Sequence, residues 1–235
     1  MTFSVAARCA RTGQLGVAVS TAVPAVGAIC PFVAPGVGAI ATQSWVNPYL
    51  GIDGLTLLAQ GLSAPEALAR LIADDPGRKV RQVGIVDAAG RVAQHSGDDC
   101  TPWFGEASGD GFACQGNMLT GAEVIAAMAQ SMEVSAAEAL DERLMRALEA
   151  GQAAGGDMRG RQSASLKIHG TEEYPLLDLR VDAHEQPVAE LRRVLEIARR
   201  QLLPFVTGMS TRTNPHGELS EEVTSMLLCG PDDRL

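Results

Sequence analysis

Thr2 stands directly after the initiator methionine, where a hydroxyl and a free α-amine can occur on one residue. Cells usually remove Met1 when the second residue is small, and this removal would leave both groups on Thr2. An α-amine has an ordinary pKa of roughly 7.7 to 8.0, so near neutral pH it can accept the proton of the hydroxyl. We therefore predict that Thr2 is the nucleophile of a hydrolase after removal of Met1, although many proteins without such activity also begin with Met-Thr.

Polar residues at the ends of apolar runs are candidates to assist Thr2. Ser20 and Thr21 end one such run, and both are candidates to orient the amine of Thr2, with Ser20 assigned to the catalytic set; a plain solvated strand end is the alternative. Gln43 ends another apolar run, and Asn117 lies in a Gly-Asn-Met turn. The side-chain amides of both are candidates to donate hydrogen bonds to substrate or to an oxyanion. A purely conformational role in the turn is the alternative for Asn117.

A glycine-rich segment, residues 151–160, introduces three charged candidates for substrate binding. Arg159 and Arg161 can clamp a substrate carboxylate, whereas Asp157 can bind a substrate amine or pair with an arginine. A solvated loop stabilised by its own ion pairs is the alternative. Asn47, which precedes a proline, completes the substrate-binding set, with a structural role in a turn as its alternative.

Other kinds of catalytic site find little support. The sequence has no Gly-x-Ser-x-Gly, no Gly-Lys-Ser/Thr phosphate loop, no His-Glu-x-x-His and no Gly-x-Gly-x-x-Gly that opens a helix, and we expect no cofactor. Residues 95–100 contain metal-ligand types without a recognisable spacing, so we expect no metal. The five cysteines form no Cys-x-x-Cys pair, which indicates reduced thiols. A cysteine hydrolase that uses Cys30 or Cys114 rests on residue type alone.

A strand must position Thr2, and residues 2–21 have the alternation of a β-hairpin. Apolar residues recur at positions 3, 5 and 7 and again at 15, 17 and 19, with turn chemistry in residues 10–14. Further strands are predicted at 37–42, 82–87, 91–95, 112–115, 163–169 and 176–181. Helical spacing, including a capping box at Ser63 and Glu66, predicts helices at 51–61, 63–75, 121–132, 136–150 and 188–203, the last ended by Pro204. This block order favours an α+β fold with helices on both outer faces of two packed sheets.

Short motifs accompany the opening hairpin along nearly the whole chain to about residue 200. They are Ala25-Val-Gly-Ala-Ile29, Gly38-Ala-Ile-Ala-Thr-Gln43, Asn47-Pro48, Gly51, Asp75-Pro-Gly77, Arg81-Gln-Val-Gly-Ile-Val-Asp87, Gln115-Gly-Asn-Met-Leu119, Ala153-Ala-Gly-Gly-Asp157, Arg159-Gly-Arg-Gln-Ser163 and Leu179-Arg-Val-Asp182. The hairpin resembles that of N-terminal-nucleophile (Ntn) hydrolases such as proteasome β subunits. Together with the motifs, it resembles an uncharacterised bacterial and archaeal family of that superfamily, the domain of unknown function 1028.

The resemblance implies a four-layer αββα sandwich with two antiparallel sheets, and it implies hydrolysis of amide bonds. Proteasome-type sites also place a lysine beside the nucleophile. This chain has only Lys79 and Lys167, neither near the first hairpin in sequence, and Lys167 is the one that a late strand could bring close.

Charge and composition restrict the partners. The net charge of −9 opposes binding to nucleic acid, which requires clustered Lys and Arg. We find neither a membrane-spanning stretch nor a signal peptide, and therefore expect no membrane partner and a cytoplasmic location. Residues 1–204 are expected to form the domain, and residues 205–235 a tail with one short helix near 220–228. Apolar residues toward the tail favour a homodimer.

Two functions remain open. The first is an amidohydrolase that cleaves the C–N bond of a small polar substrate through Thr2. The second is a non-catalytic protein on the same fold, which holds a small ligand in the cleft or assembles into an oligomer. The hydrolase predicts that loss of the Thr2 hydroxyl abolishes activity while the fold is retained, whereas the binding protein predicts that this loss leaves ligand affinity or assembly unchanged.

Overall fold

The alternation in residues 2–21 produces a hairpin of two strands, β1 (Thr2–Arg8) and β2 (Leu15–Thr21), in the computed structural model, which describes residues 2–231. The strands pair antiparallel, from Thr2 opposite Thr21 to Arg8 opposite Leu15. Both strands are almost entirely buried because each of their faces is covered. The hairpin therefore occupies the centre of the fold.

The larger sheet has the strand order β10-β9-β2-β1-β8-β7, with every pair antiparallel. Its other strands are β7 (Gly105–Gly109), β8 (Phe112–Asn117), β9 (Ser163–His169) and β10 (Leu177–Val181). The smaller sheet, also antiparallel, has the order β3-β4-β5-β6. Its strands are β3 (Pro31–Ala34), β4 (Gly38–Ser44), β5 (Arg81–Asp87) and β6 (Val92–Ser96).

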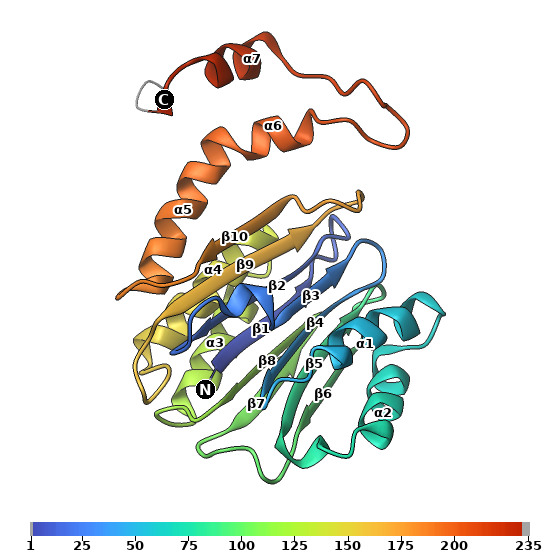
Figure 1. Cartoon of the computed structure of the whole chain (residues 1–235), viewed down its shortest axis with the longest axis vertical. Coiled ribbons are helices and arrows are strands. Elements are labelled where there is room, and N and C mark those ends of the chain that lie inside the picture. Colours follow the sequence, from blue (N-terminus) through green and yellow to red (C-terminus); the bar gives the residue numbers. More distant parts are fainter. Residues whose placement is uncertain (1, 232–235) are drawn as a thin grey trace.

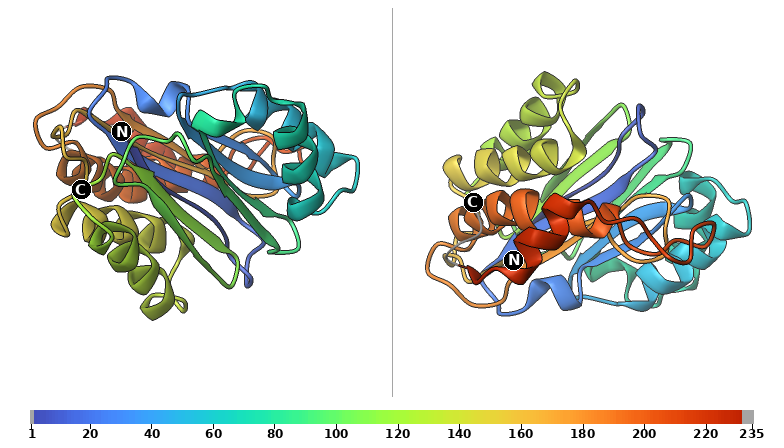
Figure 2. Two further views of the ribbon diagram at one scale, coloured as in Figure 1. Left: turned by 90° about the horizontal axis from the view of Figure 1, so that it is seen from below. Right: turned by 90° about the horizontal axis from the view of Figure 1, so that it is seen from above.

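Helices cover the outer face of each sheet, and Figure 2 shows the two sheets between these layers. On the smaller sheet lie α1 (Tyr49–Ala59) and α2 (Ala64–Asp74). On the larger sheet lie α3 (Glu123–Val134), α4 (Leu140–Ala153) and α5 (Pro187–Gln201). The predicted capping box at Ser63 and Glu66 begins α2. The α+β fold with helices on both outer faces of two antiparallel sheets is thus confirmed (Figure 1).

Three apolar cores follow from this layering. One core lies between the larger sheet and its helices, one between the two sheets, and one between the smaller sheet and its helices. Phe3 and Val5 belong to the helix-facing core, whereas Ala6 belongs to the core between the sheets. Even-numbered residues of β1, including Thr2, therefore face the opposite sheet.

Several element boundaries differ from the prediction. The strands β3 and β7 were not predicted, and α4 begins at Leu140 rather than at residue 136. Pro204 does not end the late helix: α5 ends at Gln201, and Pro204 lies in the first turn of a short helix, α6 (Leu203–Thr207). Proline is tolerated there because the first helical N–H groups have no intrahelical acceptor. The predicted tail contains α7 (Glu221–Leu228), and residues 232–235 lie outside the described part.

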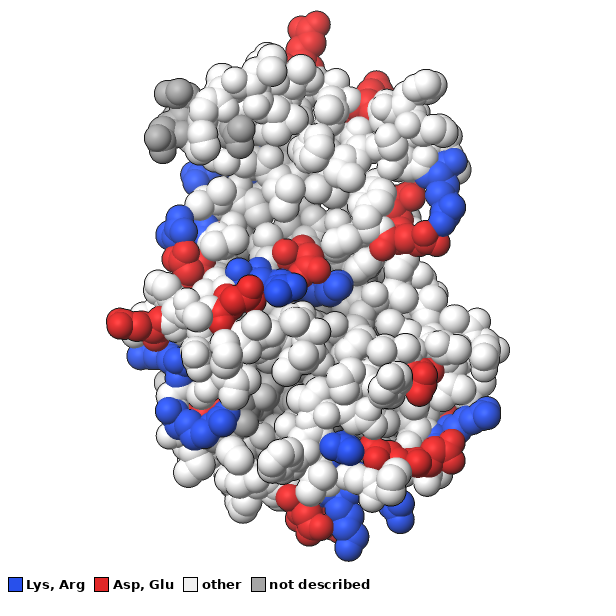
Figure 3. Space-filling model, viewed as in Figure 1, with Lys and Arg blue, Asp and Glu red and all other residues white. Residues whose placement is uncertain are grey.

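The surface carries charges of both signs. On the face in Figure 3, acidic and basic side chains lie beside one another, largely toward the outline. Many of them form ion pairs, such as those that join Arg192 and Arg199 to Glu142. No helix in the described residues is long and apolar enough to cross a membrane.

Candidate functional site

Thr2 lies at a cavity where the first residue of β1 meets the ends of its two neighbouring strands. It pairs with Thr21 of β2 on one side and with Asn117 of β8 on the other. The cavity has a volume of about 300 Å³ and is lined by Thr2, Gln43 and Asn117, among others. Thr2 itself is only 7% exposed. The strand thus presents Thr2 at the inner end of a space large enough for a small molecule.

Thr21, rather than Ser20, contacts Thr2. The Thr2 Oγ1 donates a hydrogen bond to Thr21 Oγ1 at 3.2 Å. Ser20 is paired with Phe3, and its hydroxyl donates to the backbone carbonyl of Ser163 at 3.3 Å. Because side chains alternate along a strand, Ser20 lies on the opposite face of the sheet from Thr21. Of the two candidates at the end of β2, Thr21 is therefore the one whose hydroxyl contacts Thr2.

A buried cluster of side-chain amides supports the cavity. Gln43 Nε2 donates to the carbonyl of Thr2 at 3.1 Å and to Gln82 Oε1 at 2.8 Å, and it lies 3.4 Å from the carbonyl of Gln115. Since an amide nitrogen has only two hydrogens, these acceptors engage Gln43 fully. Asn117 Nδ2 donates to Gln82 Oε1 at 3.0 Å. That one bond leaves Asn117 a second hydrogen to donate.

The predicted charged loop reaches the cavity through Arg159. Asp157, which is buried, accepts hydrogen bonds from the backbone N–H of Ala22 at 3.0 Å and of Arg159 at 2.8 Å. Its carboxylate also pairs with the Arg159 guanidinium at 3.3 Å. Arg159 lines the cavity, so Asp157 ties the loop to the end of β2 and holds the arginine in place. Arg161 instead lines a separate pocket with Glu149 on α4.

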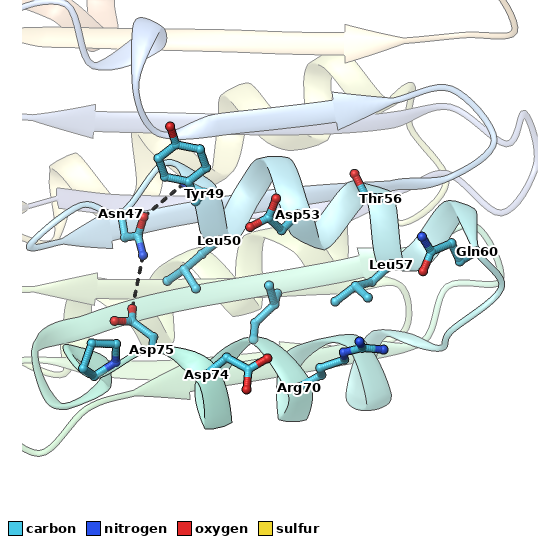
Figure 4. A pocket seen from close by; sticks show the side chains of 12 residues that line it. Asn47, Tyr49, Leu50, Asp53, Thr56, Leu57, Gln60, Arg70, Asp74 and Asp75 are labelled. Atoms are coloured by element: carbon cyan, nitrogen blue, oxygen red, sulfur yellow. Dashed lines mark hydrogen bonds between the residues drawn. The ribbon is translucent and has the colours of Figure 1, made fainter.

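Asn47 also lies away from the Thr2 cavity. It lines a groove between α1 and α2, as Figure 4 shows. Its Nδ2 donates to Asp75 Oδ2 at 3.3 Å, and its Oδ1 accepts from the backbone N–H of Tyr49 at 3.1 Å. Asn47 therefore fixes the entry to α1, whereas the predicted substrate-binding residues Gln43 and Arg159 do meet at the cavity.

Sequence reasoning missed the apolar lining of the cavity. Trp45, at 68% exposure, and Ile29 are large exposed residues in this lining. Ser44 and Met118, which also line it, have φ values of 69° and 50°, a backbone region that residues other than glycine rarely adopt. Such strained residues gather at functional sites, but their φ values could not be read from the sequence. The remaining lining residues are Val23, Val26, Cys30, Val46 and Thr101.

The other candidate nucleophiles and bases are poorly placed. Complete burial raises the pKa of the Cys30 thiol to about 12 and raises that of Cys114 even further, so both remain protonated at neutral pH. Lys167 pairs with Asp178 at 3.2 Å and lies opposite Val17, four residues along β2 from Thr21. Within the described residues, no group of three or more His, Cys, Asp or Glu is placed to hold a metal ion.

The fold and the hydroxyl-lined cavity define an α+β sandwich with a candidate site at the start of its central strand. The chain belongs to the Family of unknown function (DUF1028), whose model matches residues 2–191. A search of curated proteins gave no match.

Among solved structures, the crystal structure of a protein of this family from Silicibacter pomeroyi has a TM-score of 0.85 and 25% identity over 93% of this chain and 99% of that one. Two Anbu proteins (ancestral beta-subunit) are more distant. The protein from Yersinia bercovieri has a TM-score of 0.37 and 12% identity, covering 83% of this chain and 93% of that one. The Gly-1 mutant from Hyphomicrobium sp. strain MC1 has a TM-score of 0.32 and 14% identity, covering 86% of this chain and 96% of that one.

Proposed function

We propose that this protein is an Ntn-type amidohydrolase that cleaves the C–N bond of a small polar amide through Thr2. The observation that carries the proposal is the position of Thr2, whose hydroxyl lies 3.2 Å from that of Thr21 in a cavity lined by Asn117 and Arg159. The proposal requires removal of Met1, which lies outside the described residues. Thr2 then has a free α-amine beside its hydroxyl.

In the first half-reaction, Thr2 Oγ1 attacks the carbonyl carbon of the substrate while the α-amine takes the hydroxyl proton. The free hydrogen of Asn117 Nδ2 donates to the oxyanion of the tetrahedral intermediate. The C–N bond breaks, the α-ammonium group returns the proton to the departing amine, and an ester forms on Thr2. Water then attacks this ester with the same amine as base, which releases the acid and regenerates the hydroxyl.

Residues around Thr2 orient its hydroxyl and bind the substrate. Thr21 accepts the hydrogen bond of Thr2 and thereby orients its hydroxyl, and Gln43 holds the carbonyl of Thr2. Arg159 supplies a positive group for a carboxylate on the substrate. With a volume of about 300 Å³ and walls that include Val26 and Ile29, the cavity suits a small amide that has an apolar part and one carboxylate.

The first experiment measures the intact mass and N-terminal sequence of untagged protein purified from cells. We expect Met1 to be absent and Thr2 to be the first residue. A library of small amides, enriched in compounds with a carboxylate, is then tested for hydrolysis with wild type, Thr2→Ala and Thr2→Ser. Wild type and Thr2→Ser should release amine, because both have a hydroxyl.

The Thr2→Ala protein should retain the circular dichroism spectrum of wild type and lose the activity, because Thr2 makes its strand pairing through the backbone. A retained Met1, or hydrolysis by Thr2→Ala equal to that of wild type, would contradict the mechanism.

One observation favours the second candidate, a binding protein without catalysis. In the described residues, neither lysine lies at Thr2: Lys167 pairs with Asp178, and Lys79 lies in the short 3-10 helix Arg78–Val80 beside β5. A binding protein should hold an unhydrolysed amide from the library with the same affinity in wild type and in Thr2→Ala. Hydrolysis by wild type that is lost in Thr2→Ala, with affinity unchanged, would instead favour the hydrolase.

A further inference from the structure

A second cavity lies at the other end of β1 and is lined by three arginines. It has a volume of about 420 Å³ and is bordered by the β1–β2 turn, the β7–β8 turn and the α3–α4 pair. Arg8 ends β1, Arg11 lies in the turn that follows, and Arg143 belongs to α4. Since a strand rises about 3.3 Å per residue, this arginine cavity lies roughly 20 Å from Thr2. It is separate from the candidate active site.

Arg143 is the buried member of the group. It is only 6% exposed, and its Nη2 donates to the carbonyl of Met132 at 3.2 Å. Its Nε is buried and has no hydrogen-bond partner in the described residues. Burial, together with the charge of Arg11, lowers the pKa of Arg143, whereas Cys9 and Asp110 oppose that shift. A buried charge without a counter-charge is costly, so the chain on its own leaves this site incomplete.

The lack of an acidic partner for these arginines does not reflect a shortage of acidic residues in the protein. The net charge is −9, and arginines elsewhere, such as Arg192 and Arg199, pair with several carboxylates each. Within the described chain, Arg8, Arg11 and Arg143 form no ion pair.

Two acids also line the arginine cavity, but neither neutralises Arg143. Asp110 and Glu133 are both exposed, so water screens their charges. The inner part of the cavity therefore presents positive charge.

The thiol of Cys9 also lines the arginine cavity. Burial raises the pKa of Cys9, but hydrogen bonds from Thr12 and Arg11 and the charge of Arg11 outweigh burial, and the pKa falls below its ordinary value. Of these two residues, only Arg11 lines the cavity, so it contributes part of the stabilisation of negative charge there. Arg11 is held in position by the hydrogen bond from its Nη2 to the carbonyl of Glu138 at 2.7 Å.

We propose that the arginine cavity binds a small anion with a phosphate or carboxylate group, with Arg143 at its buried end and Arg8 and Arg11 at its mouth. Guanidinium groups suit such ligands because their planar N–H groups match pairs of anionic oxygens. Arg143 lines the cavity and is only 6% exposed, so its guanidinium supplies positive charge at the inner end. The bound anion would provide the counter-charge that Arg143 lacks.

The test is isothermal titration calorimetry of the full chain with inorganic phosphate and, separately, with succinate, at a fixed ionic strength. We expect saturable binding of at least one anion, and the stronger of the two identifies the ligand as phosphate-like or carboxylate-like. Arg143→Gln should weaken that binding about tenfold or more, since it removes charge-assisted hydrogen bonds.

Two further variants keep the test decisive if Arg143→Gln does not fold. Arg11→Gln alters an exposed turn residue and should also weaken binding. The matched control is Arg70→Gln, an exposed arginine in the groove between α1 and α2, which should bind as wild type does. The proposal is overturned if neither anion binds wild type at millimolar concentration, or if Arg11→Gln and every folded Arg143 variant bind as tightly as Arg70→Gln.

Discussion

At the residue scale, Asn117 differs from the other amides because one of its two hydrogens has no acceptor in the buried cluster. If this hydrogen stabilises an oxyanion, its effect is confined to the transition state. We therefore expect Asn117→Ala to lower kcat about 100-fold or more, as loss of an oxyanion donor does, with little change in KM. Steady-state kinetics on the amide that wild type hydrolyses would measure this split.

The control for this prediction is Asn214→Ala, which makes the same change in an exposed loop near the C-terminus. It should retain the kcat of wild type. A rise in KM at constant kcat in Asn117→Ala would instead assign Asn117 to substrate binding.

Also at the residue scale, the sequence indicated which residues gather at Thr2 but not which faces they occupy. Turn chemistry in residues 10–14 centres the hairpin on Thr12, whereas the observed pairs place the midpoint between Arg11 and Thr12. A shift of one position in register moves every side chain to the other face of a strand. This sensitivity explains why Thr21, rather than Ser20, contacts Thr2, and why spacing alone could not decide between them.

At the element scale, the contact between α4 and α5 depends on a carboxylate in contact with several arginines. Glu142 lies 2.7 Å from Arg192 Nη1 and 2.8 Å from Arg199 Nη2. Hydrogen bonds from Arg192, opposed in part by burial, and further bonds from Arg199 and Arg146 lower its pKa from 4.5 to about 2. Because the folded pKa is depressed, the stabilisation is complete above pH 4.5 and is lost as the pH falls toward 2.

We therefore expect Glu142→Gln to destabilise the protein at pH 7 by up to about 3 kcal/mol. The difference from wild type should shrink between pH 4.5 and pH 2, where wild type loses the same charge. Urea unfolding of both proteins across this range would measure it. Glu133→Gln, an exposed change on α3, should have little effect at any of these pH values. A Glu142→Gln effect that is constant with pH would show that packing, rather than charge, joins the two helices.

The two missed strands, β3 and β7, differ from the predicted strands in their local sequence. Strands with alternating or continuous apolar residues, such as β2 and β5, were predicted, whereas β3 and β7 were not. Both missed strands lie at an edge of their sheet. The strand β3 begins with Pro31, and β7 has the sequence Gly-Glu-Ala-Ser-Gly, with two glycines and one apolar side chain. In β3 the proline masks a strand of only four residues, and in β7 a single apolar residue gives no alternation, so neither local sequence carried a strand signal.

At the scale of the whole molecule, the homodimer expected from the sequence stays a prediction. Figure 1 shows α7 far from the sheets, beyond α5 and α6. Leu228 of α7 is 85% exposed, and a helix as short as α7 is marginal without packing. We expect light scattering to give twice the mass of one chain, and we expect Leu228→Glu to shift the protein toward the monomer. A measured mass of wild type equal to that of one chain would exclude the dimer.

The amide of Gln82 joins the facing sides of the two sheets, and we expect it to contribute to the stability of the whole sandwich. Gln82 Oε1 accepts from Gln43 on its own sheet and from Asn117 on the opposite sheet, and its Nε2 donates to the carbonyl of Gly116 at 2.9 Å. The change Gln82→Leu leaves several of these buried groups without a partner and should lower the free energy of unfolding by about 3 kcal/mol. Gln94→Leu, which removes one half-buried bond to the carbonyl of Cys114, should cost about 1 kcal/mol. Urea unfolding would compare them, and equal losses would mean that the amide cluster adds nothing beyond an ordinary hydrogen bond between the sheets.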